Sequence, residues 1–180
     1  MTPAELAKIV DGARCKIIGS EDAGNDGHRM VLAALIRAFN TSESALLCEP
    51  SLARKTRRPP DIVLIDPEVG VHVFEVKAIA LDQIESLEAG GQMRIRYPMN
   101  VRNANPIVQV RNAMFDIKDA TVRAFGGEIR LPLKYWVIFP MIRQVSWKGR
   151  FGEGGFCPPE FLFKEAIEMC IRDRDRVDCG

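Results

Sequence analysis

The chain has 180 residues, of which 47% are hydrophobic and 27% are charged, and its formal net charge is +1. This length is enough for one domain with a substantial core, and the composition is ordinary for a globular protein. Because the charges are nearly balanced, the whole chain is not a polycation, and any binding to nucleic acid has to come from local groups of basic residues.

The cysteines and the N-terminus indicate the cellular compartment in which we expect this chain. The five cysteines include no Cys-x-x-Cys pair, and with only two histidines this argues against a structural zinc site. An odd number of scattered cysteines is typical of a reducing cytosol. The N-terminus lacks the layout of a signal peptide, and no run has the roughly 18 apolar residues that a membrane span needs. We therefore expect a cytoplasmic protein with no membrane partner.

The first part of the chain predicts a short helix, a connecting segment and a long helix. Residues 2–10 combine a capping threonine, a proline in the first turn and a small apolar stripe. Residues 11–20 predict a loop or a short strand. A helix from Asn25 or Asp26 to about Phe39 follows, with apolar residues at helical spacing.

A basic segment precedes the most informative stretch of the sequence. Residues 44–49 predict a short strand, and four basic residues then lead to Pro59-Pro60, which favours an extended chain. Such charges usually form only a solvated loop, but here they stand directly before Asp61. The candidates for contacts with backbone phosphates are Arg54, Arg57 and Arg58.

Residues 61–79 predict a β-hairpin. Its arms, 62–65 and 71–79, are apolar and rich in β-branched residues, and the segment between them carries turn residues. When the hairpin is folded about Glu68, residues equally distant from it along the chain lie opposite one another.

This pairing brings two carboxylates together, because Asp61 and Glu75 are each seven residues from Glu68. Facing residues have Cβ atoms roughly 4.5–5.5 Å apart, and carboxylates that close repel each other unless a cation lies between them. A hard divalent ion such as Mg²⁺ binds carboxylates, phosphate oxygens and water. Lys77 shares the face of Glu75, where it is placed to hold an attacking water or to neutralise a phosphate.

Downstream, residues 84–87 and 93–97 predict a second hairpin that turns at 89–91. The stretch from Ala89 to Met114 contains four arginines and no acidic residue. Among these arginines, the candidates for phosphate contacts are Arg96 and Arg111.

The last third of the chain predicts two helices and a central strand. Asn105-Pro106 starts a helix that ends at Gly126-Gly127, carries Gln109 in its first turn and is expected to place Arg111 and Lys118 along the same groove. Residues 134–140 predict an apolar strand. Residues 143–158 predict a polar, glycine-rich loop, and 158–169 a last helix. Trp147 and Lys148 are the candidates for exposed residues in that loop.

The ordered set of these pieces resembles the PD-(D/E)xK nuclease superfamily, and within it the nuclease-related (NERD) domain found at the front of bacterial helicase-like proteins. The resemblance covers roughly residues 21 to 140. The matching parts are the helix start at Gly27, then Arg58-Pro59-Pro60-Asp61, Phe74-Glu75-Val76-Lys77 and Asn105-Pro106-Ile107-Val108-Gln109.

This resemblance implies an α/β fold with a restriction-endonuclease-like core, in which helices flank a mixed central sheet. It implies metal-dependent hydrolysis of nucleic-acid phosphodiesters, with DNA as the expected partner and a helicase or repair protein as the associate. Asp61, Glu75 and the carbonyl of Val76 would bind Mg²⁺ or Mn²⁺. Lys77 would orient the water, and Gln109 would lie beside the metal.

One position departs from the family pattern. Where the family usually has a glutamate after the helix-start glycine, this chain has His28, which can bind a metal or act as a base but adds no negative charge. A carboxylate from Glu21, Asp26 or Glu49 within about 6 Å of the Asp61–Glu75 pair would favour catalysis. Without one, a non-catalytic nucleic-acid-binding module is the alternative. A third interpretation is an interaction domain in which Glu75 and Lys77 form an internal ion pair.

We expect an N-terminal extension over residues 1–20, a nuclease-related core over 21–142, and a C-terminal loop and helix over 143–169. Residues 170–180 form a tail of different character. The segment from Met169 to Arg174, where the tail begins, looks like translated adapter sequence, which predicts that the natural chain continues differently.

Overall fold

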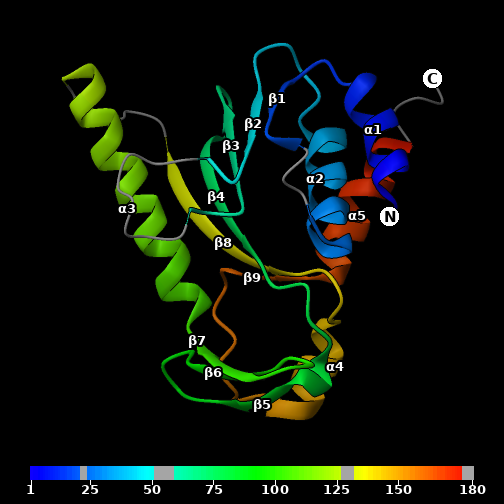
Figure 1. Ribbon diagram of the computed structural model, residues 1–180, viewed down its shortest axis with the longest axis vertical. Helices are drawn as coiled ribbons and strands as arrows, with labels where there is room; N and C mark the ends of the chain where they lie inside the picture. The colour runs from blue at the N-terminus through cyan, green and yellow to red at the C-terminus, as the bar shows by residue number, and fades with distance from the viewer. Residues whose placement is uncertain (21–23, 51–58, 127–131, 176–180) are drawn as a thin grey trace.

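The computed structural model describes residues 1–20, 24–50, 59–126 and 132–175. Within them, a six-stranded mixed sheet has the strand order β1-β2-β3-β4-β8-β9 (Figure 1). The pairs β1–β2, β4–β8 and β8–β9 are parallel, whereas β2–β3 and β3–β4 are antiparallel. The strands are β1 (Lys16–Ile18), β2 (Ala45–Cys48), β3 (Ile62–Asp66), β4 (Gly70–Val76), β8 (Leu133–Phe139) and β9 (Phe161–Phe163).

Helices cover both faces of this sheet. In Figure 1, α1 (Pro3–Asp11), α2 (Asp26–Ala38) and α5 (Lys164–Asp175) lie on one side, and α3 (Pro106–Phe125) lies on the other. This confirms the predicted fold class, an α/β fold with a mixed central sheet, and it is compatible with a restriction-endonuclease-like core. No helix in the described residues is long and apolar enough to cross a bilayer.

A second, three-stranded antiparallel sheet lies below the main sheet in Figure 1, next to the short helix α4. The short 3₁₀ helix η2 (Leu81–Gln83) leads into it from β4. Its strands are β5 (Ile84–Leu87), β6 (Met93–Arg96) and β7 (Val101–Ala104), and α4 spans Gln144–Phe151.

The β3–β4 hairpin has the predicted register. Ile62 pairs with Phe74 and Asp66 with Gly70, so the same register carried one residue further sets Asp61 opposite Glu75. The turn is held by the Asp66 carboxylate, which accepts the backbone N–H groups of Glu68 (2.9 Å) and Val69 (3.0 Å). This turn fixes the register that aligns the two acidic residues.

Alternation along β4 divides its side chains between two cores. Phe74 and Val76 pack in the cluster that contains α2, whereas Val71 and Val73 pack in the cluster that contains residues of α3. Glu75 has the same parity as Val73 and therefore points to the α3 side of the sheet.

The C-terminal part differs from the sequence prediction. The segment expected as a polar loop contains α4, and Trp147 in it is fully buried rather than exposed, because its ring packs against Phe139 at a centroid distance of 5.0 Å and against Phe161 at 5.6 Å. Lys148 is exposed, as predicted. The expected helix from 158 begins only at Lys164, after strand β9, and strand β7 was not predicted.

Candidate active site

Asp61 and Glu75 lie inside the protein, where β3 begins and β4 ends. Asp61 is 3% exposed and Glu75 is 0% exposed. The N–H of Val76 donates to Asp61 Oδ2 at 2.6 Å, and Lys77 donates to Glu75 as the cation of a buried ion pair. Buried carboxylates are stable only with such partners. This hydrogen bond and this ion pair therefore hold the two acids at defined positions in the interior.

Helix α2 brings His28 to Asp61. Asn25 caps the helix by accepting the His28 N–H at 3.0 Å, and the helix start lies close to the end of β4. A Cβ on Gly27 would come within 2.3 Å of Ala78 Cβ, so only glycine permits this approach. As a result, His28 Nε2 lies 3.5 Å from Asp61 Oδ2.

Glu49 approaches the same place from the end of β2. Its backbone N–H donates to the Asp61 carbonyl at 2.9 Å, and its φ of 41° is in the left-handed region that non-glycine residues rarely adopt. Potential ligand atoms of His28, Glu49 and Asp61 all lie within 4.8 Å of one another. This exposed carboxylate is thus close to Asp61, whereas Asp26 instead pairs with Arg29, and Glu21 lies outside the described residues.

The donor set fits a divalent cation. Two carboxylates and one imidazole are ligands that Mn²⁺ and related ions accept, and Mg²⁺ accepts the carboxylates. The predicted ligand Asp61 belongs to this group, and His28 and Glu49 join it. Glu75 is not a member, since it is the partner of Lys77, so ligation by Glu75 and by the Val76 carbonyl stays a prediction.

The charges around His28 favour its protonated form. Burial of the ring opposes protonation and is the largest single influence. The hydrogen bond and charge of Asp61, the Val76 backbone and the charge of Glu49 together outweigh it and raise the pKa of His28 above its ordinary value. The same carboxylates would also favour a metal cation, which would have to replace the proton on His28 because a protonated imidazole has no free lone pair.

Lys77 joins the sheet to α3. It is 7% exposed, and its Nζ donates both to Glu75 and to Gln109 Oε1, the latter at 3.3 Å. The Nε2 group of Gln109 is buried and has no hydrogen-bond partner among the described residues. The structure therefore brings together Glu75, Lys77 and Gln109, and leaves the two N–H donors of the Gln109 amide available.

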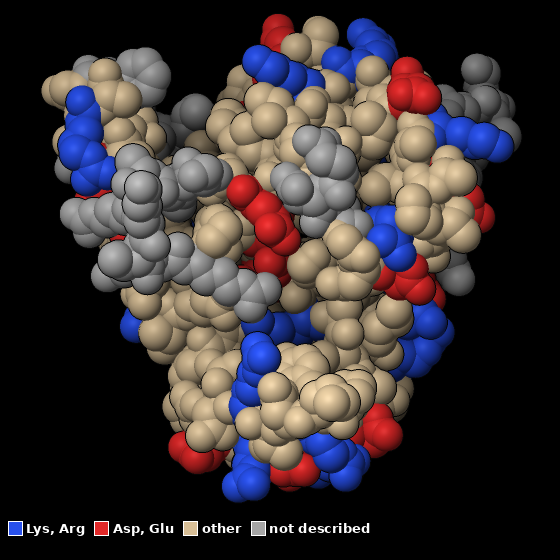
Figure 2. All heavy atoms as spheres, viewed as in Figure 1, with Lys and Arg blue, Asp and Glu red and all other residues tan. Residues whose placement is uncertain are grey.

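A cavity of about 250 Å³ opens beside these residues. His28, Val76 and Lys77 line it from the main sheet side, and Tyr97 and Arg102 line it from the small sheet. The Arg102 guanidinium lies 5.9 Å from the centre of the Tyr97 ring. On the face of the molecule shown in Figure 2, acidic side chains gather near the middle and basic side chains lie directly below them.

Comparisons with protein-family models, with curated proteins and with solved structures give no match for this chain. The resemblance to the NERD domain therefore stays an interpretation of the sequence motifs.

The basic residues predicted to contact phosphates are placed differently. Arg96 is exposed on β6, and its guanidinium donates to the Asp82 carbonyl at 3.4 Å. Arg111 is exposed on α3, about 200° around the helix from Gln109, and so points away from the Lys77–Gln109 contact. Arg54, Arg57 and Arg58 lie outside the described residues.

Arg102 is the site residue that the sequence did not single out. It was only one of several arginines in an acid-free stretch, and its position depends on β7, whose exposed, polar sequence gives no strand pattern. The sequence feature that pointed towards Arg102 was the absence of acidic residues between Ala89 and Met114.

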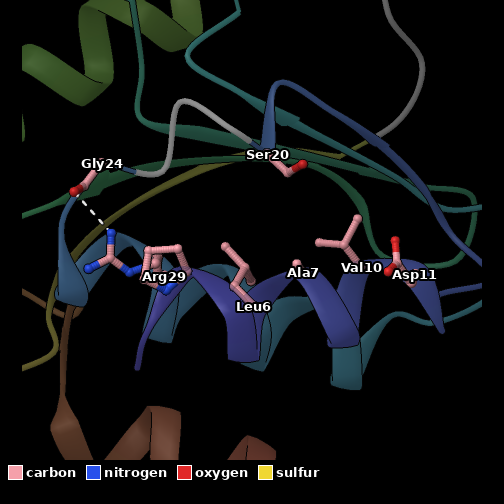
Figure 3. A pocket seen from close by; sticks show the side chains of 8 residues that line it. Leu6, Ala7, Val10, Asp11, Ser20, Gly24 and Arg29 are labelled. Carbon is pink, nitrogen blue, oxygen red and sulfur yellow. Dashed lines mark hydrogen bonds between the residues drawn. The ribbon is translucent and has the colours of Figure 1, made fainter.

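A larger cavity of about 500 Å³ lies between α1 and the start of α2 (Figure 3). Leu6, Ala7 and Val10 form its floor, with Arg29 at one end and Asp11 at the other. The Arg29 guanidinium donates to the carbonyls of Met1 (2.9 Å) and Gly24 (3.0 Å), which fastens the N-terminus to α2. Since Arg29 is engaged in these contacts and the floor is apolar, the cavity beside Lys77 is the better candidate for chemistry.

Proposed function

We propose that this protein is a metal-dependent nuclease, which hydrolyses phosphodiester bonds of nucleic acid, with DNA as its substrate. The observation that carries the proposal is the meeting of His28, Glu49 and Asp61 next to the buried Glu75–Lys77–Gln109 group, with one member of each group, His28 and Lys77, lining the same cavity. Buried ionisable groups gathered at a cavity are a common feature of catalytic sites. The association with a helicase or repair protein rests on the sequence resemblance alone.

Different residues of the protein would have different roles in the reaction. His28, Glu49 and Asp61 would hold a divalent cation, Mg²⁺ or Mn²⁺, which supplies Lewis-acid polarisation of the phosphoryl oxygen. Lys77, held by Glu75, provides positive charge where negative charge develops in the transition state. The available amide donor of Gln109 would orient a phosphate oxygen or the attacking water.

Substrate positioning would come from the small sheet. Arg102 places a guanidinium at the cavity, where it can contact a backbone phosphate without reading sequence. Tyr97, beside it, offers an aromatic face on which an unpaired base can stack. Both residues line the same cavity as Lys77 and His28, so a strand bound in the cavity would contact residues of both sheets' surroundings at once.

A second candidate is a nucleic-acid-binding module that does not cleave. It is favoured by the imidazole at position 28, which lowers the negative charge available to a cation, and by the engagement of Glu75 with Lys77. This alternative predicts salt-sensitive binding of DNA without turnover.

The deciding experiment measures cleavage of labelled single- and double-stranded DNA with Mg²⁺ or Mn²⁺. We expect metal-dependent cleavage by the wild type and a loss of at least 100-fold in Asp61→Asn and in Lys77→Ala, in keeping with about 10²–10³-fold for one transition-state contact. Glu68→Gln, an exposed carboxylate in the distant hairpin turn, is the matched control and should keep full activity. Salt-sensitive binding with no cleavage under any condition would favour the binding module. Neither binding nor cleavage would leave the Glu75–Lys77 pair as a structural feature of an interaction domain.

A further inference from the structure

The outward face of α3 carries a stripe of exposed residues. Val108, Phe115 and Val122 are 36%, 50% and 37% exposed, although their side chains are large and apolar. Arg111 and Asp119, also exposed, lie between them. Successive members of this set are three or four residues apart, so all of them project from one side of the helix. We call Val108, Arg111, Phe115, Asp119 and Val122 the α3 stripe.

The stripe lies on the side of α3 opposite to its packed face. Val110 and Ala113, which are 0% and 5% exposed, pack into the core against the sheet. At about 100° of rotation per residue, Phe115 lies roughly opposite the centre of this packed face. The helix stands at one side of the molecule in Figure 1, with the sheet on its other side.

The order of residues in the stripe is symmetrical about Phe115. Val108 and Val122 are each seven residues from it, and Arg111 and Asp119 are each four residues from it. If a second copy of α3 packs antiparallel with Phe115 on the two-fold axis, each valine faces a valine and each Arg111 faces an Asp119. A two-fold interface requires this kind of self-complementary surface.

Within the part of the chain that the structure describes, the charges of the stripe have no partner of opposite charge. Among the described residues, neither Arg111 nor Asp119 forms an ion pair. In a parallel arrangement Arg111 would face Arg111, which like-charge repulsion disfavours. The charge pattern thus selects the antiparallel pairing over the parallel one.

We propose that the α3 stripe is an antiparallel self-association surface, through which two copies of this chain form a two-fold symmetric dimer. This proposal goes beyond the nuclease activity and does not depend on it. A contact through one helix belongs to the small class of interfaces that bury less than about 1,200 Å² in total, and such complexes dissociate on dilution.

Sedimentation equilibrium of the full chain over a wide concentration range tests the proposal. The wild type should show a concentration-dependent dimer. Arg111→Asp and Asp119→Arg should each weaken it by about tenfold or more, because each replaces two attractive contacts across the axis by two repulsive ones. Arg123→Asp, which changes the same charge on the same helix outside the stripe, is the control and should dimerise like the wild type.

The decisive measurement is an equimolar mixture of the two charge variants. In a mixed dimer, the aspartate introduced at position 111 of one copy would face the arginine introduced at position 119 of the other. The native Asp119 of the first copy would face the native Arg111 of the second, so every facing pair would again be of opposite charge. The mixture should therefore dimerise where neither variant does alone, which misfolding of a variant could not produce. A wild type that stays monomeric at all concentrations, charge variants that dimerise unchanged, or a mixture that stays monomeric would each overturn the proposal.

Discussion

Glu75 depends on Lys77 for its place in the core. The carboxylate is 0% exposed, and Lys77, itself 7% exposed, is the cation paired with it. Lys77→Met should therefore lower the free energy of unfolding by about 3–5 kcal/mol, the usual cost of removing one partner of a buried pair. Urea unfolding measures this difference.

The matched control is the double variant Glu75→Gln/Lys77→Met, in which no charge is left in the pair. It should recover most of the stability lost in Lys77→Met, because a neutral amide is far less costly to bury than a carboxylate without its cation. If both variants were equally unstable, the loss would come from the packing of the lysine stem and not from its charge.

If the site binds a metal ion as proposed, His28 should influence which cation it prefers. An imidazole with two carboxylates suits Mn²⁺ better than Mg²⁺, which prefers oxygen ligands. We expect Mn²⁺ to raise the melting temperature more than Mg²⁺ does, and His28→Glu to shift this preference towards Mg²⁺. Thermal unfolding with each ion at matched concentrations measures the effect, and Glu68→Gln serves as a control that keeps the wild-type order. Equal shifts before and after the substitution would remove His28 from the ligand set.

At the level of elements, α2 can hold His28 at the site only because of Gly27. A Cβ at this position would lie 2.3 Å from Ala78 Cβ and 3.0 Å from Pro140 Cγ, so Gly27→Ala must push the helix start away from the segments that follow β4 and β8. We expect a loss of about 1–3 kcal/mol from overpacking, together with weaker stabilisation by metal. Chemical denaturation with and without Mn²⁺ measures both.

Gly149, unlike Gly27, has space for a side chain. It lies within α4, and no atom would lie within 4 Å of an added Cβ. Gly149→Ala should therefore stabilise the protein by about 0.5–1 kcal/mol, since alanine is the better helix former. If Gly27→Ala were equally harmless, the start of α2 would not be in close contact with Ala78 and Pro140.

The β3–β4 turn is expected to be sensitive to acid through Asp66. Burial, the largest single influence, raises the pKa of this carboxyl, but the hydrogen bonds from Ser44, Val69 and Glu68 outweigh burial and lower the pKa below its ordinary value. A carboxyl with a depressed pKa contributes stability above its ordinary pKa, and this stability is lost as the pH falls through the folded-state pKa. Asp66→Asn should thus cost about 1–2 kcal/mol at neutral pH, and the difference from the wild type should shrink near pH 3.

Urea unfolding at the two pH values checks this expectation. Asp82→Asn, an exposed carboxylate in η2, should change the free energy of unfolding by less than about 0.5 kcal/mol at either pH. A difference for Asp66→Asn that stayed constant with pH would mean that its effect comes from shape rather than charge.

These elements also show how far the sequence could be interpreted. The β3–β4 hairpin was predictable because alternation, turn residues and register are local properties, and they sufficed to set Asp61 opposite Glu75. Helix α4 was not predictable, because its N-cap residue Arg143 makes no capping hydrogen bond. The position of the helix depends instead on the aromatic partners of Trp147, which are distant in the sequence. The place of Glu49 depends on a left-handed φ and on a bond to Asp61, neither of which a side-chain pattern reveals.

At the scale of the whole molecule, the candidate site lies where the two sheets meet. The small sheet is fixed to the main sheet by a shared core, in which Ile84, Met93 and Ile95 are fully buried in the same cluster as Phe139 and Trp147. The Arg150 guanidinium of α4 also donates to the Ile84 carbonyl at 2.8 Å. The small sheet can therefore hold Arg102 at a defined position on the cavity that Lys77 also lines.

This arrangement predicts a specific role for Arg102 in binding. If a nucleic-acid strand lies in the cavity, Arg102→Ala should weaken DNA binding to a similar extent for all sequences and reduce the slope of log K against log salt by about 1, as expected for the loss of one phosphate contact. Fluorescence anisotropy with labelled DNA at several salt concentrations measures the slope. Arg94→Ala is the matched control, because Arg94 lies on the same sheet but pairs with Glu85 at 3.0 Å and does not line the cavity. Equal slopes for both variants would mean that the arginines of the small sheet act only through overall charge, and the strand would then have to bind elsewhere.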